Sequence, residues 1–577
     1  MIFRSVSRKA ASVLRDPVLR RWILGAVLGR WRRPAPFTPN LPSYLRSLTP
    51  PADTPAVVSA RAAAFHLPDV TPPSAPLVLA LPGETVTIDV ADPAALFAHA
   101  YPDTETLLAV HRFAWLPLTP DLDSGWVDAL WRAWTNRFAT PDKSWAWHPY
   151  TAAERAINIL DFSRRRGLPG DRDATLALLA RHAAAIARQL EYFGDHDTGN
   201  HLSNNGRGLY LLGLALGLPD AVEMGARILL AEAARIFRPS GVLREGSSHY
   251  HLLLVRNYVS AWLAARRHGR PEAETLGEIV RRAFSVLPHL VLPGGMPLVG
   301  DISPDCPPGF LAGLLPGGDM TRGWCAMLED DERAALARLN QETRPVSPDR
   351  LAADGWVRFI DLGWAALWHV APDGWPPMPG HAHQDMGSLE LHYGDEALFV
   401  DPGRGAYGEA DEAGIFTSGA AHNSLLVNGR DPYPPNKPYY DVAFRRTVCG
   451  PPPRILRRRD GLTVAHNGFS RLAGVGEVER RFVFAAGSVS IVDRIEGSRE
   501  KIITRRLHTP LPARLDGEAA VLEGQTARFR ISADGPITVT PGKRWTAYGI
   551  AAPASVLEVK HTTRLPVTLR LAIEVTS

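Results

Sequence analysis

The sequence predicts a multidomain protein in which a stack of antiparallel helical hairpins precedes a large antiparallel β-sandwich or supersandwich. The chain has 577 residues, which is more than one ordinary hydrophobic core accommodates. Apolar residues recur at helical spacing over most of 100–345. After Gly355 the pattern changes to short, alternating, β-branched segments. Because strands and helices do not alternate, and because no glycine-rich phosphate motif occurs, we do not expect a nucleotide-binding α/β fold.

The first 33 residues form a basic N-terminal extension. Nine of them are Arg or Lys and one is Asp, whereas the whole chain carries a net charge of +4. The remainder therefore carries about −4, and we expect no nucleic-acid partner for the body of the protein. The apolar run Trp22–Leu28 is too short to span a bilayer. Either a basic amphipathic helix in peripheral contact with a membrane surface or a solvated helical extension accounts for it.

The same segment bears on the compartment. Arg30–Arg33 follows the apolar run without a small-residue cleavage site, so a conventional signal peptide is not predicted. This favours a cytoplasmic or membrane-peripheral location over a periplasmic one. The three cysteines lack a Cys-x-x-Cys pattern, which argues against a disulfide framework and against a thiolate zinc site.

Four segments are expected along the chain. Residues 1–45 are the basic extension, and 46–100 are a linker with a small hairpin, in which Pro82-Gly83-Glu84 separates two apolar strands. Residues 101–350 are the helical domain and 351–577 the sheet domain. Helices are predicted over 125–138, 151–165, 173–193, 203–217, 220–237, 249–267 and 271–287. Strands are predicted over 356–363, 388–393, 397–401, 423–428, 478–485, 488–494, 501–507 and 567–576.

Two polar clusters interrupt the helical pattern. In the first, a helix that begins near Asn200 would place His201 and Asn204 on one face; alternatively, Asn200 is an N-cap and the other amides are solvated. In the second, Tyr250 follows Glu245 across a loop-to-helix boundary. A tyrosine can act as a general acid or base when its phenol lies near cations or substrate; alternatively, it packs between helices.

A third cluster lies in the predicted sheet domain. On extended backbone the two imidazoles of His381-x-His383 face the same way. The hairpin that follows ends at Asp401, and His422 comes 21 residues later. Two histidines and an aspartate from neighbouring strands are a reasonable ligand set for Zn²⁺ or a similar ion. The alternative is a chance run of histidines in a sandwich.

These clusters, in this order, resemble the heparinase II/III-like polysaccharide lyases, a bacterial group that also includes alginate and oligoalginate lyases. The resemblance covers roughly residues 100–577. It is carried by Trp145–Tyr150 with Arg155 and Asn158, Asn200-His201-x-x-Asn204, Glu245-x-Ser247-x-His249-Tyr250, Gly300-Asp301, His381-x-His383-x-Asp385, Asp401-Pro402-Gly403 and His422-Asn423.

The resemblance implies an incomplete (α/α) toroid followed by antiparallel sheets, and a carbon–oxygen lyase that cleaves an anionic, uronic-acid-containing polysaccharide or oligosaccharide by β-elimination. In the roles it implies, Asn204 neutralises the uronate carboxylate with His201 nearby, Tyr250 is the acid and also the base for syn elimination, and His381 is the base on the opposite face. Implied substrate-binding residues are Asn200, Arg155 and Glu245. The implied metal ligands are His383, Asp401 and His422, for one structural divalent ion, Zn²⁺.

Three alternatives stay open at this point. The neutralising amide is Asn200, Asn204 or Asn205. A glycoside hydrolase on the same toroid would need two carboxylic acids, for which Glu245 and Asp301 are available. A non-catalytic carbohydrate-binding factor in polysaccharide synthesis or export would keep the fold without the reaction.

Overall fold

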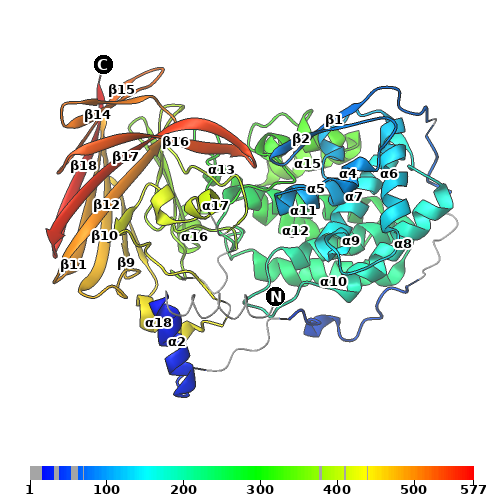
Figure 1. The fold of residues 1–577 in the computed structure, drawn as a ribbon, viewed down its shortest axis with the longest axis horizontal. Coiled ribbons are helices and arrows are strands. Elements are labelled where there is room, and N and C mark those ends of the chain that lie inside the picture. Colours follow the sequence, from blue (N-terminus) through cyan, green and yellow to red (C-terminus); the bar gives the residue numbers. More distant parts are fainter. Residues whose placement is uncertain are drawn as a thin grey trace.

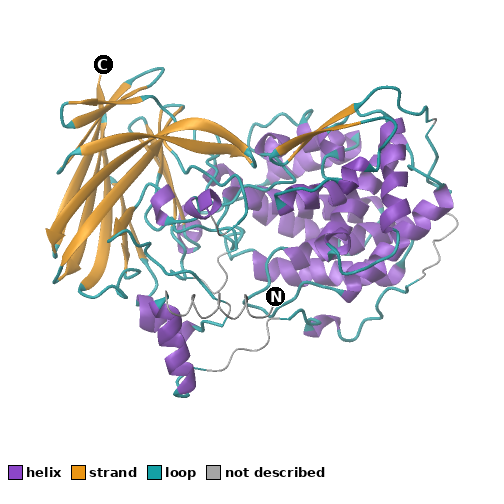
Figure 2. Cartoon of the chain, viewed as in Figure 1, coloured by secondary structure: helices purple, strands orange, loops and turns teal. Residues whose placement is uncertain are grey.

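The structure is a computed structural model that describes residues 16–31, 38–53, 61, 63–68, 70–375, 380–408, 411–437 and 439–576. Predictions for residues 1–15 and 32–37 of the basic extension, and for 54–60 of the linker, lie outside the described residues. A helical domain and a sheet domain lie side by side (Figure 1), and the separation of helices from strands is nearly complete (Figure 2). The predicted fold class is confirmed.

The helical domain is built of consecutive antiparallel hairpins. Helices α5, α7, α9 and α11 pack on one another in succession, and α8, α10 and α12 pack against them. Almost every residue of α7, α9 and α11 is buried, whereas α8, α10 and α12 each keep an exposed face. The first set is therefore the inner layer of the toroid and the second is the outer layer.

The helices begin and end where local chemistry dictates. Asp103, Asp123 and Asp171 are N-caps whose carboxylates accept backbone N–H groups at the starts of α5, α6 and α8. Helix α9 ends at Gly217, whose φ of 72° suits glycine. The helical elements of the described chain are α2 (Pro17–Val27), η1 (Ser43–Leu45), α4 (Ala95–Ala98), α5 (Thr104–Arg112), η2 (Leu116–Leu118), α6 (Ser124–Phe138), η3 (Trp145–Trp147), α7 (Pro149–Arg166), α8 (Arg172–Arg188), α9 (His201–Leu216), α10 (Pro219–Ile236), α11 (Ser248–Arg267), α12 (Ala273–Phe284), α13 (Leu287–Leu290), α14 (Pro308–Leu311), η4 (Ala312–Leu314), η5 (Gly323–Met327), α15 (Asp330–Glu342), α16 (Pro348–Ala353), α17 (Asp411–Ile415), η6 (Gly419–Ala421) and α18 (Val442–Cys449).

The sheet domain contains three antiparallel sheets, in the orders β13-β14-β15-β18-β11-β10-β9-β8, β16-β17-β12-β7 and β3-β4-β5-β6. Trp368, Phe482 and Leu557, one from each sheet, belong to a single buried core. The strands are β3 (Trp356–Asp361), β4 (Trp364–His369), β5 (Glu390–Tyr393), β6 (Glu396–Phe399), β7 (Leu425–Val427), β8 (Arg454–Arg458), β9 (Gly461–His466), β10 (Val475–Ala485), β11 (Ser488–Gly497), β12 (Glu500–Thr509), β13 (Ala513–Asp516), β14 (Ala519–Glu523), β15 (Arg528–Ala533), β16 (Ile537–Ala547), β17 (Ile550–Arg564) and β18 (Val567–Thr576).

Two hairpins join the domains along one edge. The predicted linker hairpin is present as β1 (Leu77–Leu81) and β2 (Glu84–Ile88), and the long β16–β17 hairpin reaches toward it (Figure 1). A Cβ placed at Gly549 would lie 2.4 Å from Gly83 Cα, so the two turns are in direct contact. Beside them, the Tyr548 hydroxyl donates to the Asp103 carboxylate at 2.8 Å. These contacts fix the position of the sheet domain on the toroid.

Candidate active site and metal group

Three segments distant in sequence meet where the two domains join. The backbone N–H of His381 donates to the Glu245 carbonyl at 3.0 Å, and that of Asp301 donates to the His381 carbonyl at 3.0 Å. Gly246 and Gly300, with φ of 67° and 78°, permit this approach: a Cβ on Gly300 would lie 2.6 Å from the His381 carbonyl oxygen. The loop that carries the His-x-His pair is therefore pinned onto the start of α11.

Tyr250 is held in the first turn of α11. Its backbone N–H donates to the Ser247 side chain at 3.0 Å, and this serine is the N-cap of the helix. The phenol oxygens of Tyr250 and Tyr407 are 2.7 Å apart, and Tyr407 donates onward to the Ile302 carbonyl at 2.8 Å. Tyr250 therefore donates to Tyr407. Burial raises the pKa of Tyr250 well above its usual value, so the phenol is protonated at neutral pH.

His381 lies against the same tyrosine. Its ring stacks on Tyr250 with centroids 3.4 Å apart and an interplanar angle of 14°. Its Nδ1 lies 3.1 Å from the Asp301 carboxylate, and its Nε2 lies 3.0 Å from Asn200 Nδ2. If the carboxylate accepts from Nδ1–H, Nε2 carries the lone pair and accepts from the amide. The second N–H of Asn200 donates to the Glu245 carboxylate at 2.8 Å.

Asp301 holds both histidines of the pair. One carboxylate oxygen contacts His381, and the other lies 2.9 Å from His383 Nε2 and 3.1 Å from an Arg404 nitrogen. Although desolvation opposes ionisation, the hydrogen bonds from His381 and His383 hold the pKa of Asp301 well below its usual range. Asp301 is therefore an ionised carboxylate that orients both rings.

A second imidazole, that of His201, lies at the start of α9 and is 47% exposed. Its Nδ1 lies 2.7 Å from the Glu191 carboxylate, which also accepts from Asn205 at 3.1 Å. Desolvation of the ring favours the neutral form, but Glu191 outweighs it and raises the pKa of His201. The ring of Tyr150 lies 4.6 Å from it, centroid to centroid. Glu191 thus favours a cationic imidazole that is open to solvent.

The metal group lies on the other side of Asp301. His383, Asp401 and His422 each offer one ligand atom, and these atoms lie within 4.8 Å of one another. Within the described part of the chain, His383 Nδ1 and His422 Nε2 are buried and have no hydrogen-bond partner. The Asp301 carboxylate at His383 Nε2 leaves Nδ1 available as a ligand, which is the usual orienting arrangement in metal sites. Buried nitrogens without protein partners fit a cation at their centre.

Residues 343–571 match the family model described as "Heparinase II/III-like, C-terminal". The C-terminal domain is thus similar to that of the heparinase II/III-like proteins. Among solved structures, a heparinase III is similar over 96% of this chain and 89% of its own, with a TM-score of 0.61 and 15% identity. A mutant of the heparan sulfate lyase HepC from Pedobacter heparinus is similar over 98% and 92%, with a TM-score of 0.52 and 14% identity. No curated protein matches the sequence.

The heparinase II/III-like domain contributes His381 to the group described above, and the toroid contributes Asn200, Glu245 and Tyr250. Two other residues predicted for the site lie elsewhere. Arg155, predicted to bind substrate, is fully buried in the toroid; it donates to His182 at 3.0 Å and to the carbonyls of His111 and Ala146. Asn204 is 1% exposed and accepts from Arg207 at 3.3 Å.

Three residues that contact members of the candidate site escaped the sequence analysis: Tyr407 contacts Tyr250, Arg404 contacts Asp301 and Glu191 contacts His201. Tyr407 and Arg404 lie in an irregular segment after β6, where no periodicity or motif marks them. Glu191 follows the end of α8 without any motif. The sequence offered one indirect signal for Glu191. It is an acidic residue upstream of the Asn200–Asn205 cluster, and a carboxylate can pair with a histidine, such as His201, at the start of a helix.

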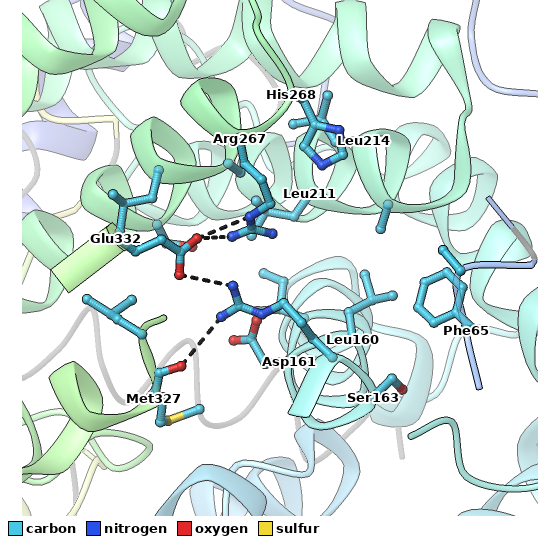
Figure 3. Close-up of a pocket in the computed structure, with 18 of the residues that line it drawn as sticks. Phe65, Leu160, Asp161, Ser163, Leu211, Leu214, Arg267, His268, Met327 and Glu332 are labelled. Atoms are coloured by element: carbon cyan, nitrogen blue, oxygen red, sulfur yellow. Dashed lines mark hydrogen bonds and ion pairs between the residues drawn. The ribbon is translucent and has the colours of Figure 1, made fainter. Parts of the chain in front are cut away.

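A separate cavity of about 260 Å³ lies in the helical domain, and none of the residues of the candidate site is among those lining it. In Figure 3, dashed lines join the two carboxylate oxygens of Glu332 to two guanidinium groups, of which that of Arg267 is labelled. Arg164 lies 3.0 Å from one carboxylate oxygen, and Arg267 Nε lies 3.1 Å from the other. This ion-pair cluster ties α7, α11 and α15 together.

Proposed function

We propose that the protein is a polysaccharide lyase that cleaves a uronic-acid-containing polysaccharide or oligosaccharide by β-elimination, leaving a C4–C5 unsaturated uronate at the new end. The observation that carries this is the contact of a buried, protonated tyrosine with an oriented imidazole and an amide at the junction of the two domains. The similarity of fold to a heparinase III and to a heparan sulfate lyase supports the same reaction class.

The reaction needs a base for the C5 proton and an acid for the leaving O4. The C5–H electron pair forms the C4–C5 double bond as the C4–O4 bond breaks, and O4 takes up a proton. His381 Nε2 can accept the C5 proton because Asp301 directs the ring proton to Nδ1. The Tyr250 hydroxyl, protonated at neutral pH, can deliver a proton to O4.

The same reaction requires neutralisation of the uronate carboxylate, since C5 is otherwise not acidic enough. We assign this to Asn200, whose amide is the one in contact with His381, together with the half-exposed His201. On substrate binding, an Asn200 N–H would turn from Glu245 toward the carboxylate and stabilise the developing enolate. Asn204 stays an alternative, although its side chain lies in the toroid core.

The stacking of Tyr250 and His381 bears on stereochemistry. No sugar ring fits between two rings whose centroids are 3.4 Å apart, so in this arrangement both groups approach a bound sugar from one side. This favours syn elimination over a path with base and acid on opposite faces. In a syn path, His381 can take the C5 proton while Tyr250 protonates O4 from the same side. Tyr250 can serve as both base and acid only if its phenol first loses its proton to a neighbouring group, and His381 then orients it.

We propose a structural metal site in the sheet domain. His383, Asp401 and His422 would hold one divalent ion, and their nitrogen and oxygen donors suit Zn²⁺. The ion would fix the His381–His383 loop to the strand end at Asp401 and to the η6–β7 segment. Its contribution would be stability and loop position.

A glycoside hydrolase is the less favoured alternative. Such an enzyme needs one carboxyl group that is protonated at the start of the reaction. Of the two carboxylic acids that such an enzyme could use here, Glu245 and Asp301, Asp301 is held ionised by its two histidine partners, and it is 5% exposed. Asp301 therefore suits an orienting role better than that of a general acid.

The test is the appearance of the unsaturated uronate chromophore. Purified protein is incubated with alginate, heparan sulfate, heparosan, hyaluronan and bacterial exopolysaccharides, and the ultraviolet absorbance of the C4–C5 double bond is followed. A rise with at least one substrate supports the lyase. New reducing ends without the chromophore would establish a hydrolase, and binding without either product would establish a non-catalytic factor.

A further inference from the structure

Helix α2 (Pro17–Val27) has two unlike faces. One face packs on the sheet domain, where Val18 is buried and the Trp22 ring lies 4.5 Å from that of Tyr439, centroid to centroid. Just beyond the helix, the Trp31 ring lies 5.2 Å from Phe444 in α18. Figure 1 shows α2 beside α18, projecting from the edge of the molecule. The helix is therefore anchored to the protein by aromatic contacts.

The opposite face of α2 is apolar and exposed. Leu24, Val27 and Leu28 are 63%, 80% and 66% exposed. They recur at the three- and four-residue spacing that places side chains on one side of a helix. Arg20 and Arg21, four and three residues before Leu24, are also exposed. A row of leucine and valine between arginines is the pattern of a helix that lies in a membrane interface.

The distribution of charge along the sequence also favours contact with an anionic surface. The first 33 residues hold nine basic residues and one acidic residue, whereas the remainder of the chain carries about −4. Attraction to an anionic surface is therefore concentrated in the part of the sequence that contains α2. Within the part of the chain that the structure describes, no helix has the length and apolar character to cross a bilayer. With 11 residues, α2 is itself too short to span a bilayer.

We propose that the exposed face of α2 docks the protein onto an anionic lipid bilayer. Leu24, Val27 and Leu28 enter the boundary between headgroups and acyl chains, and the exposed Arg21 and Arg30 pair with lipid phosphates. A nucleic acid would satisfy the arginines but leave the three apolar side chains in water. Because α2 is packed on the sheet domain, docking would hold the whole enzyme at the surface.

The experiment uses the full chain and sedimentation with vesicles. One set of vesicles contains phosphatidylglycerol and phosphatidylcholine, and the other contains phosphatidylcholine alone. The protein is expected to sediment with the anionic vesicles and to be released as salt rises. The double variant Leu24→Asp, Val27→Asp is expected to bind about tenfold more weakly, since it removes inserted surface and adds negative charge. The matched control is Leu515→Asp in β13, a residue 49% exposed, which should bind like wild type.

A second variant, Arg21→Glu with Arg30→Glu, tests the charge alone and should lose binding to anionic vesicles while keeping the wild-type melting curve. The proposal is overturned by equal sedimentation with both vesicle types, or by no sedimentation at low salt. It is also overturned if the Leu24→Asp, Val27→Asp variant binds as wild type does, or if double-stranded DNA is bound and this variant keeps that binding.

Discussion

The two histidines of the His381–His383 loop share one carboxylate and enter different surroundings. On one side of Asp301, His381 contacts Asn200, Tyr250 and Glu245, so its two ring nitrogens both have protein partners. On the other side, His383 keeps one buried nitrogen without a partner, and so does His422. The ring nitrogens of His381 are thus both held by the protein, whereas His383 Nδ1 and His422 Nε2 are placed to bind a cation.

The two histidines illustrate two ways in which a protein holds side chains in position before a ligand binds. Hydrogen bonds within the protein orient His381 and Tyr250, the base and acid that we propose, because each proton already has a defined place. Buried ligands without partners are costly unless an ion binds them. Asp301 links the two, since movement of either histidine changes the bond that holds the other.

The largest effect is expected on the reactive side. Tyr250→Phe removes the proton that we assign to O4 and keeps the ring stacked on His381. Turnover should fall by about 10²–10⁴-fold with an unchanged melting curve, measured by the rate of chromophore formation. Near wild-type turnover would remove Tyr250 from the mechanism. His381→Ala in parallel reports the stereochemistry: a comparable loss makes His381 the base, and a mild loss makes Tyr250 both base and acid.

The next prediction compares the removal of two amides: that of Asn200, the N-cap of α9, and that of Asn204, four residues later. Asn200→Ala should lower turnover by about 10²–10³-fold, as does the loss of one donor to a developing oxyanion. Asn204→Ala is the matched control, because it removes the same group from a side chain that contacts Arg207 and not His381; it should affect the melting temperature more than turnover. If Asn204→Ala lowers turnover more than Asn200→Ala does, Asn204 is the amide that neutralises the uronate carboxylate.

Metal removal acts on the other side of Asp301. Elemental analysis of protein purified without an affinity tag should find about one divalent ion per chain. Asp401→Asn should lose that ion and lower thermal stability; a site with free metal a thousandfold above its Kd contributes about 4 kcal/mol. Metal-free protein of full stability would contradict the site. Loss of turnover on chelation with unchanged melting of the sheet domain would make the role catalytic.

The helical half was the more predictable part of the fold. Each predicted segment, such as 203–217 or 249–267, contains an observed helix of nearly the same bounds. All eight predicted strands are present, but others, including β4 and β13 to β17, were not predicted. In β4 all six residues are buried, so no alternation marks it, and the irregular burial of β16 reflects cover on parts of both faces. Tertiary packing determines these strands.

The site was predictable where a motif carried it. The His381–His383 pair, Asp401 and His422 could be assembled from spacing, and the structure brings His383, Asp401 and His422 together. Arg155 was expected at the substrate because it follows an aromatic motif, yet its contacts are those of a buried structural arginine. Glu191 and Tyr407 act through contacts between segments far apart in sequence, which spacing cannot reveal.

The smallest expected effect is on the pH dependence of KM, through His201. Glu191 raises the pKa of this imidazole, so the cationic form that would bind the uronate carboxylate is populated below that pKa and lost as pH rises through it. Glu191→Gln removes the negative charge and keeps a hydrogen-bonding group for His201 and Asn205. The pKa of His201 should fall, and the rise of KM with pH should therefore begin at lower pH, with KM about fivefold higher near neutrality, as expected for about 1 kcal/mol of lost pairing. Turnover at saturating substrate should change little, because Tyr250 and His381 are untouched.

A His201→Gln variant is the control: its KM should not rise with pH in this range, whether Glu191 is present or replaced by Gln. If KM follows the same pH profile in wild type and in Glu191→Gln, His201 does not bind the carboxylate, and substrate recognition belongs to Asn200 alone.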